Sequence, residues 1–149
     1  MMNIASSAFK EGEAIPAIYS CEGRNSNPPL RFNNVPGTAQ SLALIVDDPD
    51  APMGTFTHWT MWNISPTLVE VPEHYAPAQE TEGRNSSGGP GYRGPCPPSG
   101  LHRYFFKLYA LDTMLDISTE TDAIGLAEAM QGHIIATAQL MGTYQKQQK

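Results

Sequence analysis

Apolar residues in this chain gather in short runs that are separated by turns rich in glycine and proline. Runs of this kind, in which β-branched and aromatic residues are common, are typical of β-strands. We expect strands over residues 15–20, 30–33, 41–47, 55–64 and 103–111. The run over 41–47 is apolar at almost every position, which predicts a strand buried on both faces. The pattern therefore favours a mostly β fold of many short strands.

One segment near the C-terminus has helical spacing instead. Asp122 is a residue type that caps helix N-termini, so we expect a helix to begin there. Its apolar face would contain Ile124, Ala127, Met130, Ile134 and Ile135. Gly132 predicts a break into two short helices. Residues 137–144 fit either more helix or a closing strand, and the β-branched Thr137 together with Gly142 favours the strand.

Length and charge narrow the class of protein. A chain of 149 residues predicts a single domain over 1–149. Its net charge of −6 argues against a nucleic-acid partner, because phosphate backbones require a basic face. No run reaches the roughly 18 apolar residues of a membrane span, and the first ten residues lack the pattern of a signal peptide. We therefore expect a cytoplasmic protein with no stable membrane insertion.

The two cysteines, Cys21 and Cys96, do not form any metal-ligand spacing. In a cytoplasmic protein the simplest expectation is that both are free thiols, and a disulfide between them is the alternative. We expect no metal site and no cofactor.

The segment Asp-Pro-Asp-Ala-Pro at 48–52 is the first candidate for chemistry. Its two prolines restrict the backbone to extended or turn conformations, in which residues i and i+2 face the same way. Asp48 and Asp50 would then share one surface. Two close carboxylates repel, so at least one pKa should rise unless a cation or donor lies between them. His58 and His102 are the candidates for that role.

The second candidate is Gly-Pro-Cys-Pro-Pro at 94–98, which is followed by His102, Arg103 and Tyr104. On a strand, alternation places His102 and Tyr104 on one face and Arg103 on the other, where it would form an ion pair. By the same rule, His58 shares its face with Phe56. Gly94 would let a ligand approach the backbone closely and offer its N–H to an anion.

Each motif alone also has an ordinary structural explanation. An Asp-Pro pair is common in solvated turns, and a histidine on an apolar strand is usually a hydrogen-bonded core residue. A Gly-Pro-x-Pro-Pro run is more often a surface loop than a site.

Together, however, the two motifs are more specific. The chain has Asp-Pro-Asp-Ala-Pro, then His58-Trp59, then Gly-Pro-x-Pro-Pro-x-Gly-x-His-Arg-Tyr-x-Phe-x-Leu-Tyr-Ala-Leu. This sequence resembles the phosphatidylethanolamine-binding protein family, also called the Raf kinase inhibitor protein family. Gly132-His133-Ile134 and Gly142-Thr143-Tyr144 resemble its short prokaryotic branch. The resemblance extends from about Phe9 to Tyr144.

The resemblance implies a large antiparallel sheet packed on a smaller one, a β sandwich with a few peripheral C-terminal helices. It also implies a small anion pocket at one end of the sheet, which takes phosphate, acetate or a phospho-headgroup. The residues that match the family's pocket, wall or rim are Asp48, Asp50, Ala51, Pro52, Phe56, His58, Gly94, Pro95, His102 and Tyr104.

One departure from the family concerns the C-terminus. Animal members carry a longer C-terminal region whose helix closes over the pocket, and this chain lacks it. We therefore expect a more open pocket, or one that a second subunit closes. Similarity to prokaryotic relatives implies a homodimer.

The resemblance favours a non-catalytic protein that binds a small phosphate- or carboxylate-bearing ligand and, as a kinase-inhibitor-like regulator, modulates a kinase or another protein partner. Two alternatives stay open. Two carboxylates and two imidazoles suit acid–base hydrolysis of a phosphoester, and peptidase inhibitors occur in the family. A site with two carboxylates binds an anion only if protons are shared, so we expect tighter binding near pH 5 than near pH 8. An ammonium headgroup on the carboxylates would give the opposite trend.

Overall fold

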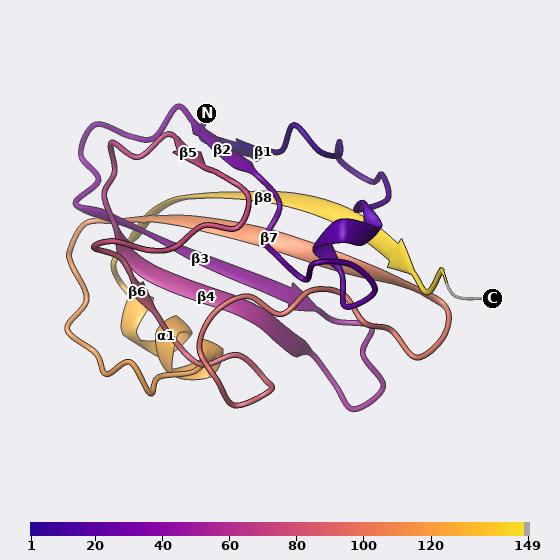
Figure 1. Ribbon diagram of the computed structural model, residues 1–149. Helices are drawn as coiled ribbons and strands as arrows, with labels where there is room; N and C mark the ends of the chain where they lie inside the picture. The colour runs from indigo at the N-terminus through magenta and orange to yellow at the C-terminus, as the bar shows by residue number, and fades with distance from the viewer. Residues whose placement is uncertain (148–149) are drawn as a thin grey trace.

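The computed structural model describes residues 1–147, and in it two antiparallel sheets pack against each other (Figure 1). The larger sheet has the order β6-β4-β3-β7-β8 and the smaller one the order β1-β2-β5. The large sheet contains β3 (Ser41–Asp48), β4 (Phe56–Ile64), β6 (Thr81–Glu82), β7 (Leu101–Leu111) and β8 (Ile134–Gln145). The small sheet contains β1 (Asn3–Ala5), β2 (Leu30–Asn33) and β5 (Glu70–Val71). The mostly β prediction is confirmed.

Four of the five predicted strands are present, as β2, β3, β4 and β7. All eight residues of β3 are buried, which confirms that this strand is covered on both faces. The predicted strand over 15–20 is wrong, because the segment forms a short 3-10 helix, η1 (Ala17–Tyr19). Pro16 has a fixed backbone angle and its carbonyl accepts a hydrogen bond from the Tyr19 N–H at 3.0 Å, which closes a turn there.

The helix predicted after Asp122 is present as α1 (Ala123–Met130), and the Asp122 carboxylate accepts a hydrogen bond from the Gly125 N–H. The predicted second helix is wrong. Gly132 has a φ of +81°, which turns the chain back, and Ile134 begins β8. β8 then pairs with the whole of β7. The closing strand predicted over 137–144 is therefore confirmed.

Two clusters of buried side chains hold the layers together. The larger fills the space between the sheets, and Trp59, Phe106 and Leu140 belong to it. The smaller lies on the other face of the large sheet, where α1 packs its Leu126 and Met130 against Trp62. Burial of large apolar side chains on both faces makes the large sheet a stable platform.

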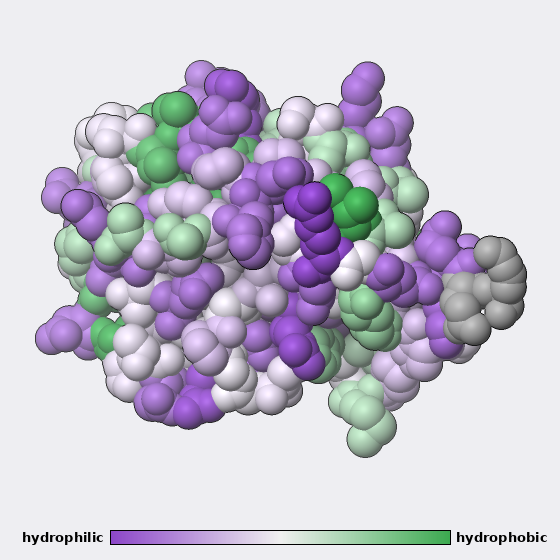
Figure 2. Space-filling view, in the orientation of Figure 1, coloured by the Kyte–Doolittle hydropathy of each residue, from purple (hydrophilic) through white to green (hydrophobic). Residues whose placement is uncertain are grey.

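The surface has a different character from the core. Figure 2 shows a largely hydrophilic face on which hydrophobic residues form only small, separate patches. Within residues 1–147, no helix is long and apolar enough to span a bilayer.

The topology brings the predicted motifs to one end of the large sheet, at the right in Figure 1. β3 ends at Asp48, which lies opposite Phe56 at the start of β4. The neighbouring strand on the other side of β3 is β7, and it begins next to His102. Antiparallel pairing thus gathers residues that are about fifty positions apart in the sequence.

Candidate functional site

Asp48 and His102 form a buried pair at this end of the sheet. The Nδ1 atom of His102 lies 2.6 Å from Oδ2 of Asp48, and the two residues are only 7% and 3% exposed. Because the carboxylate accepts, Nδ1 carries the proton and the second ring nitrogen, Nε2, is left for another partner. The Asp50 N–H donates to Oδ1 of Asp48 at 2.7 Å, so the carboxylate is held from both sides.

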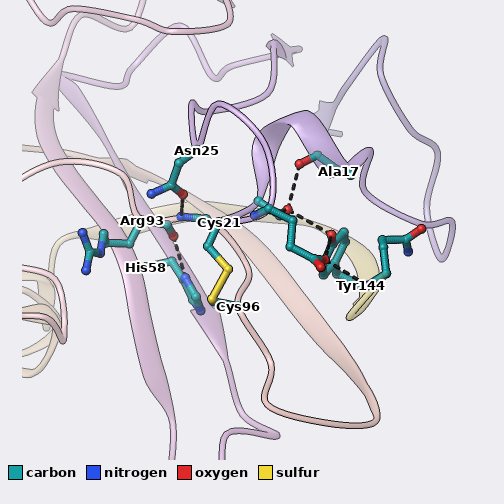
Figure 3. The surroundings of a disulfide bond; sticks show 11 residues. Ala17, Cys21, Asn25, His58, Arg93, Cys96 and Tyr144 are labelled. Carbon is teal, nitrogen blue, oxygen red and sulfur yellow. Dashed lines mark hydrogen bonds between the residues drawn. A yellow bond between two sulfur atoms is a disulfide. The ribbon is translucent and has the colours of Figure 1, made fainter. Parts of the chain in front are cut away.

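His58 is fixed in the same way, but by a main-chain group. Its Nδ1 donates to the carbonyl of Arg93 at 2.6 Å, as Figure 3 shows. Burial lowers the pKa of His58 below its ordinary value of 6.5, although the Arg93 carbonyl and the Asp48 carboxylate oppose this shift. His58 is therefore neutral at pH 7, with the lone pair on Nε2. Its ring also contacts Phe56, at 4.7 Å between ring centroids.

The ring of Tyr104 contacts the rings of both histidines. Its ring centroid is 5.2 Å from that of His58 and 6.4 Å from that of His102. The residue is 1% exposed, and its hydroxyl, although it lies near the Asp48 carboxylate, forms no hydrogen bond among the residues described. Burial, followed by the charge of Asp48, raises the pKa of Tyr104, so the phenol stays protonated. A buried hydroxyl without a partner is costly, and it marks a position where a ligand would gain a hydrogen bond.

We call Asp48, His58, His102 and Tyr104 the histidine cluster. All four were predicted as site residues, and the structure brings them together with Phe56. The remaining predicted residues have different surroundings.

The carboxylate of Asp50 binds Arg103 rather than a histidine. It accepts hydrogen bonds from the Arg103 backbone N–H at 3.0 Å and from Nε and Nη2 at 2.9 Å. These hydrogen bonds lower the pKa of Asp50 to about 2. The expectation that a histidine balances this carboxylate is wrong, because a side chain from the other face of β7 reaches it first. The predicted ion pair of Arg103 is confirmed.

Removing the Asp50 charge should have a small effect on stability. The Arg103 and Asp50 side chains are 51% and 29% exposed, so solvent screens the pair. We expect Asp50→Asn to lower the free energy of unfolding by less than about 1 kcal/mol at pH 7. The folded-state pKa of Asp50 lies below the unfolded value, so this contribution is lost as the pH falls through about 2. Urea denaturation of the wild type and the variant at pH 7 and pH 2 measures this contribution. If Asp50→Asn lowers the free energy of unfolding as much at pH 2 as at pH 7, the ion pair with Arg103 is not its source.

Gly94 and Pro95 do not offer an anion-binding main chain. The Gly94 N–H donates to Oδ1 of Asn25 at 2.7 Å, so the prediction that it is available to an anion is wrong. A Cβ at Gly94 would overlap the Tyr19 carbonyl oxygen, and thus glycine is required there for close packing of two chain segments. The Pro95 carbonyl accepts from the Cys21 N–H at 3.0 Å.

A disulfide joins the same two segments, and the expectation of free thiols is wrong. Cys21 and Cys96 are bonded, with 5.4 Å between their Cα atoms and 75 positions between them in the sequence. Tyr92 adds a hydrogen bond from its hydroxyl to the Tyr19 carbonyl at 2.8 Å. We call the joined segments 17–25 and 92–96 the clasp (Figure 3). The cytoplasmic location, from which free thiols were inferred, stays a prediction.

The clasp is part of the site because it carries Arg93, whose carbonyl fixes His58. Sequence reasoning missed Arg93 and Asn25. Arg93 acts through its carbonyl, which every residue type possesses, so no side-chain pattern could identify it.

Ala51 and Pro52 lie in the turn between β3 and β4, where the Gly54 N–H donates to the Ala51 carbonyl. No hydrogen bond or ring contact in the described part of the chain connects either residue to the histidine cluster. Residues 1–147 contain no group of three or more His, Cys, Asp or Glu side chains that could hold a metal ion.

We compared the sequence and the fold with those of known proteins. Residues 5–145 match the phosphatidylethanolamine-binding protein family. A UPF0098 protein of Methanothermobacter thermautotrophicus is 48% identical over 97% of this chain and 99% of its own length. The crystal structure of CT736 from Chlamydia trachomatis, a homologue of phosphatidylethanolamine-binding protein, superimposes with a TM-score of 0.94 at 47% identity over 97% of each chain. E. coli YbcL gives a TM-score of 0.91 at 31% identity, with 98% of this chain and 99% of YbcL covered.

Proposed function

We propose that this chain, which belongs to the phosphatidylethanolamine-binding protein family, binds a small phosphate- or carboxylate-bearing ligand at the histidine cluster without transforming it. One observation supports this most. Both histidines use Nδ1 for a partner inside the protein, and both rings contact the ring of Tyr104, whose buried hydroxyl has no hydrogen-bond partner among residues 1–147. Three polar atoms are thus left for one guest: Nε2 of His58, Nε2 of His102 and the hydroxyl of Tyr104.

The burial of the cluster favours a small ligand group. No residue in it is more than 7% exposed, so a phosphate, a carboxylate or the end of a phospho-headgroup fits better than a bulky ester. Hydrogen bonds to anionic oxygens from the Tyr104 hydroxyl, and from an imidazole Nε2 once that nitrogen is protonated, are charge-assisted and short. Asp48 opposes an anion, but its carboxylate already accepts from His102 and from the Asp50 N–H.

The pKa of His58 predicts how binding depends on pH. At neutral pH its Nε2 accepts, and below its lowered pKa the ring gains a proton and becomes a cationic donor. A bound anion favours the protonated ring, so affinity should rise as the pH falls from neutral toward the lowered pKa of the ligand-free ring. If the anion raises this pKa by one unit, affinity rises about tenfold.

Sulfate is the suitable probe because its charge is the same at pH 5 and pH 8. Isothermal titration with sulfate at both pH values measures the change, and phosphate serves as the physiological comparison. The histidine NMR signals identify the ring that titrates. Affinity that is flat between the two pH values would contradict the anion assignment. Affinity that rises with pH would contradict it too and would favour an ammonium group on Asp48.

The function itself is tested by matched histidine variants. His102 and His133 each pair through Nδ1 with an aspartate, at 2.6 and 2.8 Å, but His133 is exposed and lies at the other end of β7. We expect His102→Asn to weaken binding of phosphate and phosphoethanolamine at least about tenfold. His133→Asn should leave binding unchanged. Equal effects of the two variants, or no phosphate binding by the wild type, would disprove the proposal.

A phosphoester hydrolase is the second candidate, because a carboxylate that orients a histidine is also how a general base is held. Hydrolysis of p-nitrophenyl phosphate by the wild type, abolished in His102→Asn, would replace the binding proposal. Regulation of a kinase or inhibition of a peptidase stays a prediction from the family resemblance.

A further inference from the structure

The outer face of the large sheet, which faces away from the small sheet, is covered by α1 at only one end. There the helix packs Leu126 against Trp62, at the left in Figure 1. Side chains alternate along a strand, so Ile45 and Asp47 of β3 share this face with Lys107 of β7, which lies opposite Ile45. The part of the face beyond the helix therefore carries an apolar side chain and two charged ones close together.

A hollow lies on this uncovered part of the face. It has a volume of about 610 Å³, which suits a small organic molecule. The sheet forms its floor, α1 forms one wall, and the loop that contains Asn85 and Ser86 forms another. Asp47 and Asp48 are neighbours on β3 and point to opposite faces of the sheet, so the hollow and the histidine cluster lie on different sides of it. No residue of the cluster lines the hollow, which is therefore a separate candidate site.

Two opposite charges lie side by side in the floor of the hollow. The Lys107 ammonium donates to Oδ2 of Asp47 at 3.0 Å, and the two side chains are 33% and 12% exposed. Within residues 1–147, Oδ1 of Asp47 forms no hydrogen bond, and no oxygen or nitrogen accepts from the other two N–H groups of the ammonium. The pair can thus offer an acceptor and a donor to one ligand while its own hydrogen bond stays intact.

Apolar side chains surround this pair. Ile45, Ala127 and the ring of Tyr109 line the hollow, and so does Ile124, which is 72% exposed. An isoleucine that is this exposed leaves much apolar area in water, and an apolar group in the hollow would cover it.

The other charged groups of the hollow already have partners. Arg84 forms a salt bridge with Glu120, and the Asp122 carboxylate caps α1. The pair of Asp47 and Lys107 is therefore the charged part of the hollow that a ligand can use.

We propose that this hollow binds a zwitterionic α-amino acid with an apolar side chain. The ammonium group of the ligand donates to Oδ1 of Asp47, and its carboxylate accepts from Lys107. Its side chain rests on Ile45, Tyr109 and Ile124. The nitrogen and the carboxyl carbon of an α-amino acid are about 2.5 Å apart, which is comparable with the 3.0 Å between the charged atoms of the pair. A ligand with one charge alone would meet a like charge in the pair without compensation.

Three compounds of similar size test the charge pattern. L-Phenylalanine carries both charges, 3-phenylpropanoate lacks the ammonium group, and 2-phenylethylamine lacks the carboxylate. We expect each singly charged compound to bind at least about tenfold more weakly than L-phenylalanine, because each loses one charge-assisted hydrogen bond. Chemical-shift titration by NMR measures the three affinities. Equal affinities would overturn the proposal in favour of a purely apolar site, and so would a failure of both L-phenylalanine and L-leucine to bind at concentrations up to their solubility.

Matched variants test the residues of the hollow. Lys107→Gln removes the ammonium group and should weaken L-phenylalanine binding at least about tenfold. Lys10→Gln makes the same change at an exposed position outside the hollow and should leave binding unchanged. Ile124→Ser alters a side chain that is already exposed, so this variant should fold and should bind L-phenylalanine about threefold or more weakly. Binding that neither Lys107→Gln nor Ile124→Ser weakens would overturn the proposal.

The histidine cluster is itself proposed to bind carboxylates, so L-phenylalanine has two candidate sites. His102→Asn should weaken phosphate binding and leave L-phenylalanine binding unchanged, whereas Lys107→Gln should have the reverse effects. The two proposals can therefore fail independently. Loss of L-phenylalanine binding in His102→Asn alone would place the amino acid in the histidine cluster and overturn the assignment to the hollow.

Discussion

Reduction of the Cys21–Cys96 disulfide is expected to lower the free energy of unfolding by about 2–4 kcal/mol. The bond closes a loop between residues 75 positions apart, and long loops lose the most chain entropy in the unfolded state when they are cross-linked. Guanidinium denaturation with and without a reductant measures the difference. Since the clasp also holds the Arg93 carbonyl against His58, anion affinity should fall along with stability.

The double substitution Cys21→Ser and Cys96→Ser separates the bond from side effects of the reductant. This variant should match the reduced wild type in stability and should not respond to reductant. If the denaturation midpoint of the wild type is the same with and without reductant, the hydrogen bonds of the clasp hold its two segments together without the disulfide, and the predicted loss of stability is wrong.

Gly94→Ala should be at least as damaging, with a loss above about 2 kcal/mol or failure to fold. The added Cβ would overlap the Tyr19 carbonyl oxygen and lie 2.9 Å from Cα of Ser20. Both are main-chain atoms, which cannot move aside by changing a rotamer. Relief requires the two segments of the clasp to separate, and this would break the bond from the Gly94 N–H to Asn25.

Gly89→Ala is the matched control for this substitution. Gly89 lies five positions earlier, and a Cβ there meets nothing within 4 Å. We expect its denaturation midpoint to remain close to that of the wild type. If Gly94→Ala is as stable as Gly89→Ala, the clasp is looser than described, and the role assigned to Gly94 is wrong.

The strands and the histidine cluster were accessible from the sequence for local reasons. Apolar runs bounded by glycine and proline mark β3 and β4, and Asp122 marks the start of α1. Alternation along a strand groups His102 with Tyr104, and the family resemblance adds the match to Asp48 and His58. Each of these inferences needs only neighbours in sequence or a known motif.

The errors concern contacts between distant segments. The disulfide and the packing of Gly94 depend on how residues 17–25 lie against 92–96, which no spacing reveals. The partner of Asp50 was missed because it depends on the reach of the Arg103 side chain across two strand ends. The second helix failed because Ile134 and Ile135 fit a helical face as well as a strand, and pairing with β7 decided between them.

The hydrogen bonds that hold both imidazole rings inside the protein have a consequence for ligand binding. Asp48 and the Arg93 carbonyl already fix the tautomer and orientation of the two rings, so the groups that contact a ligand are preorganised. Association should therefore proceed with little rotamer freezing, and the empty and occupied proteins should superimpose closely around these rings. Selectivity among guests would then be decided by size and protonation of the guest rather than by induced fit.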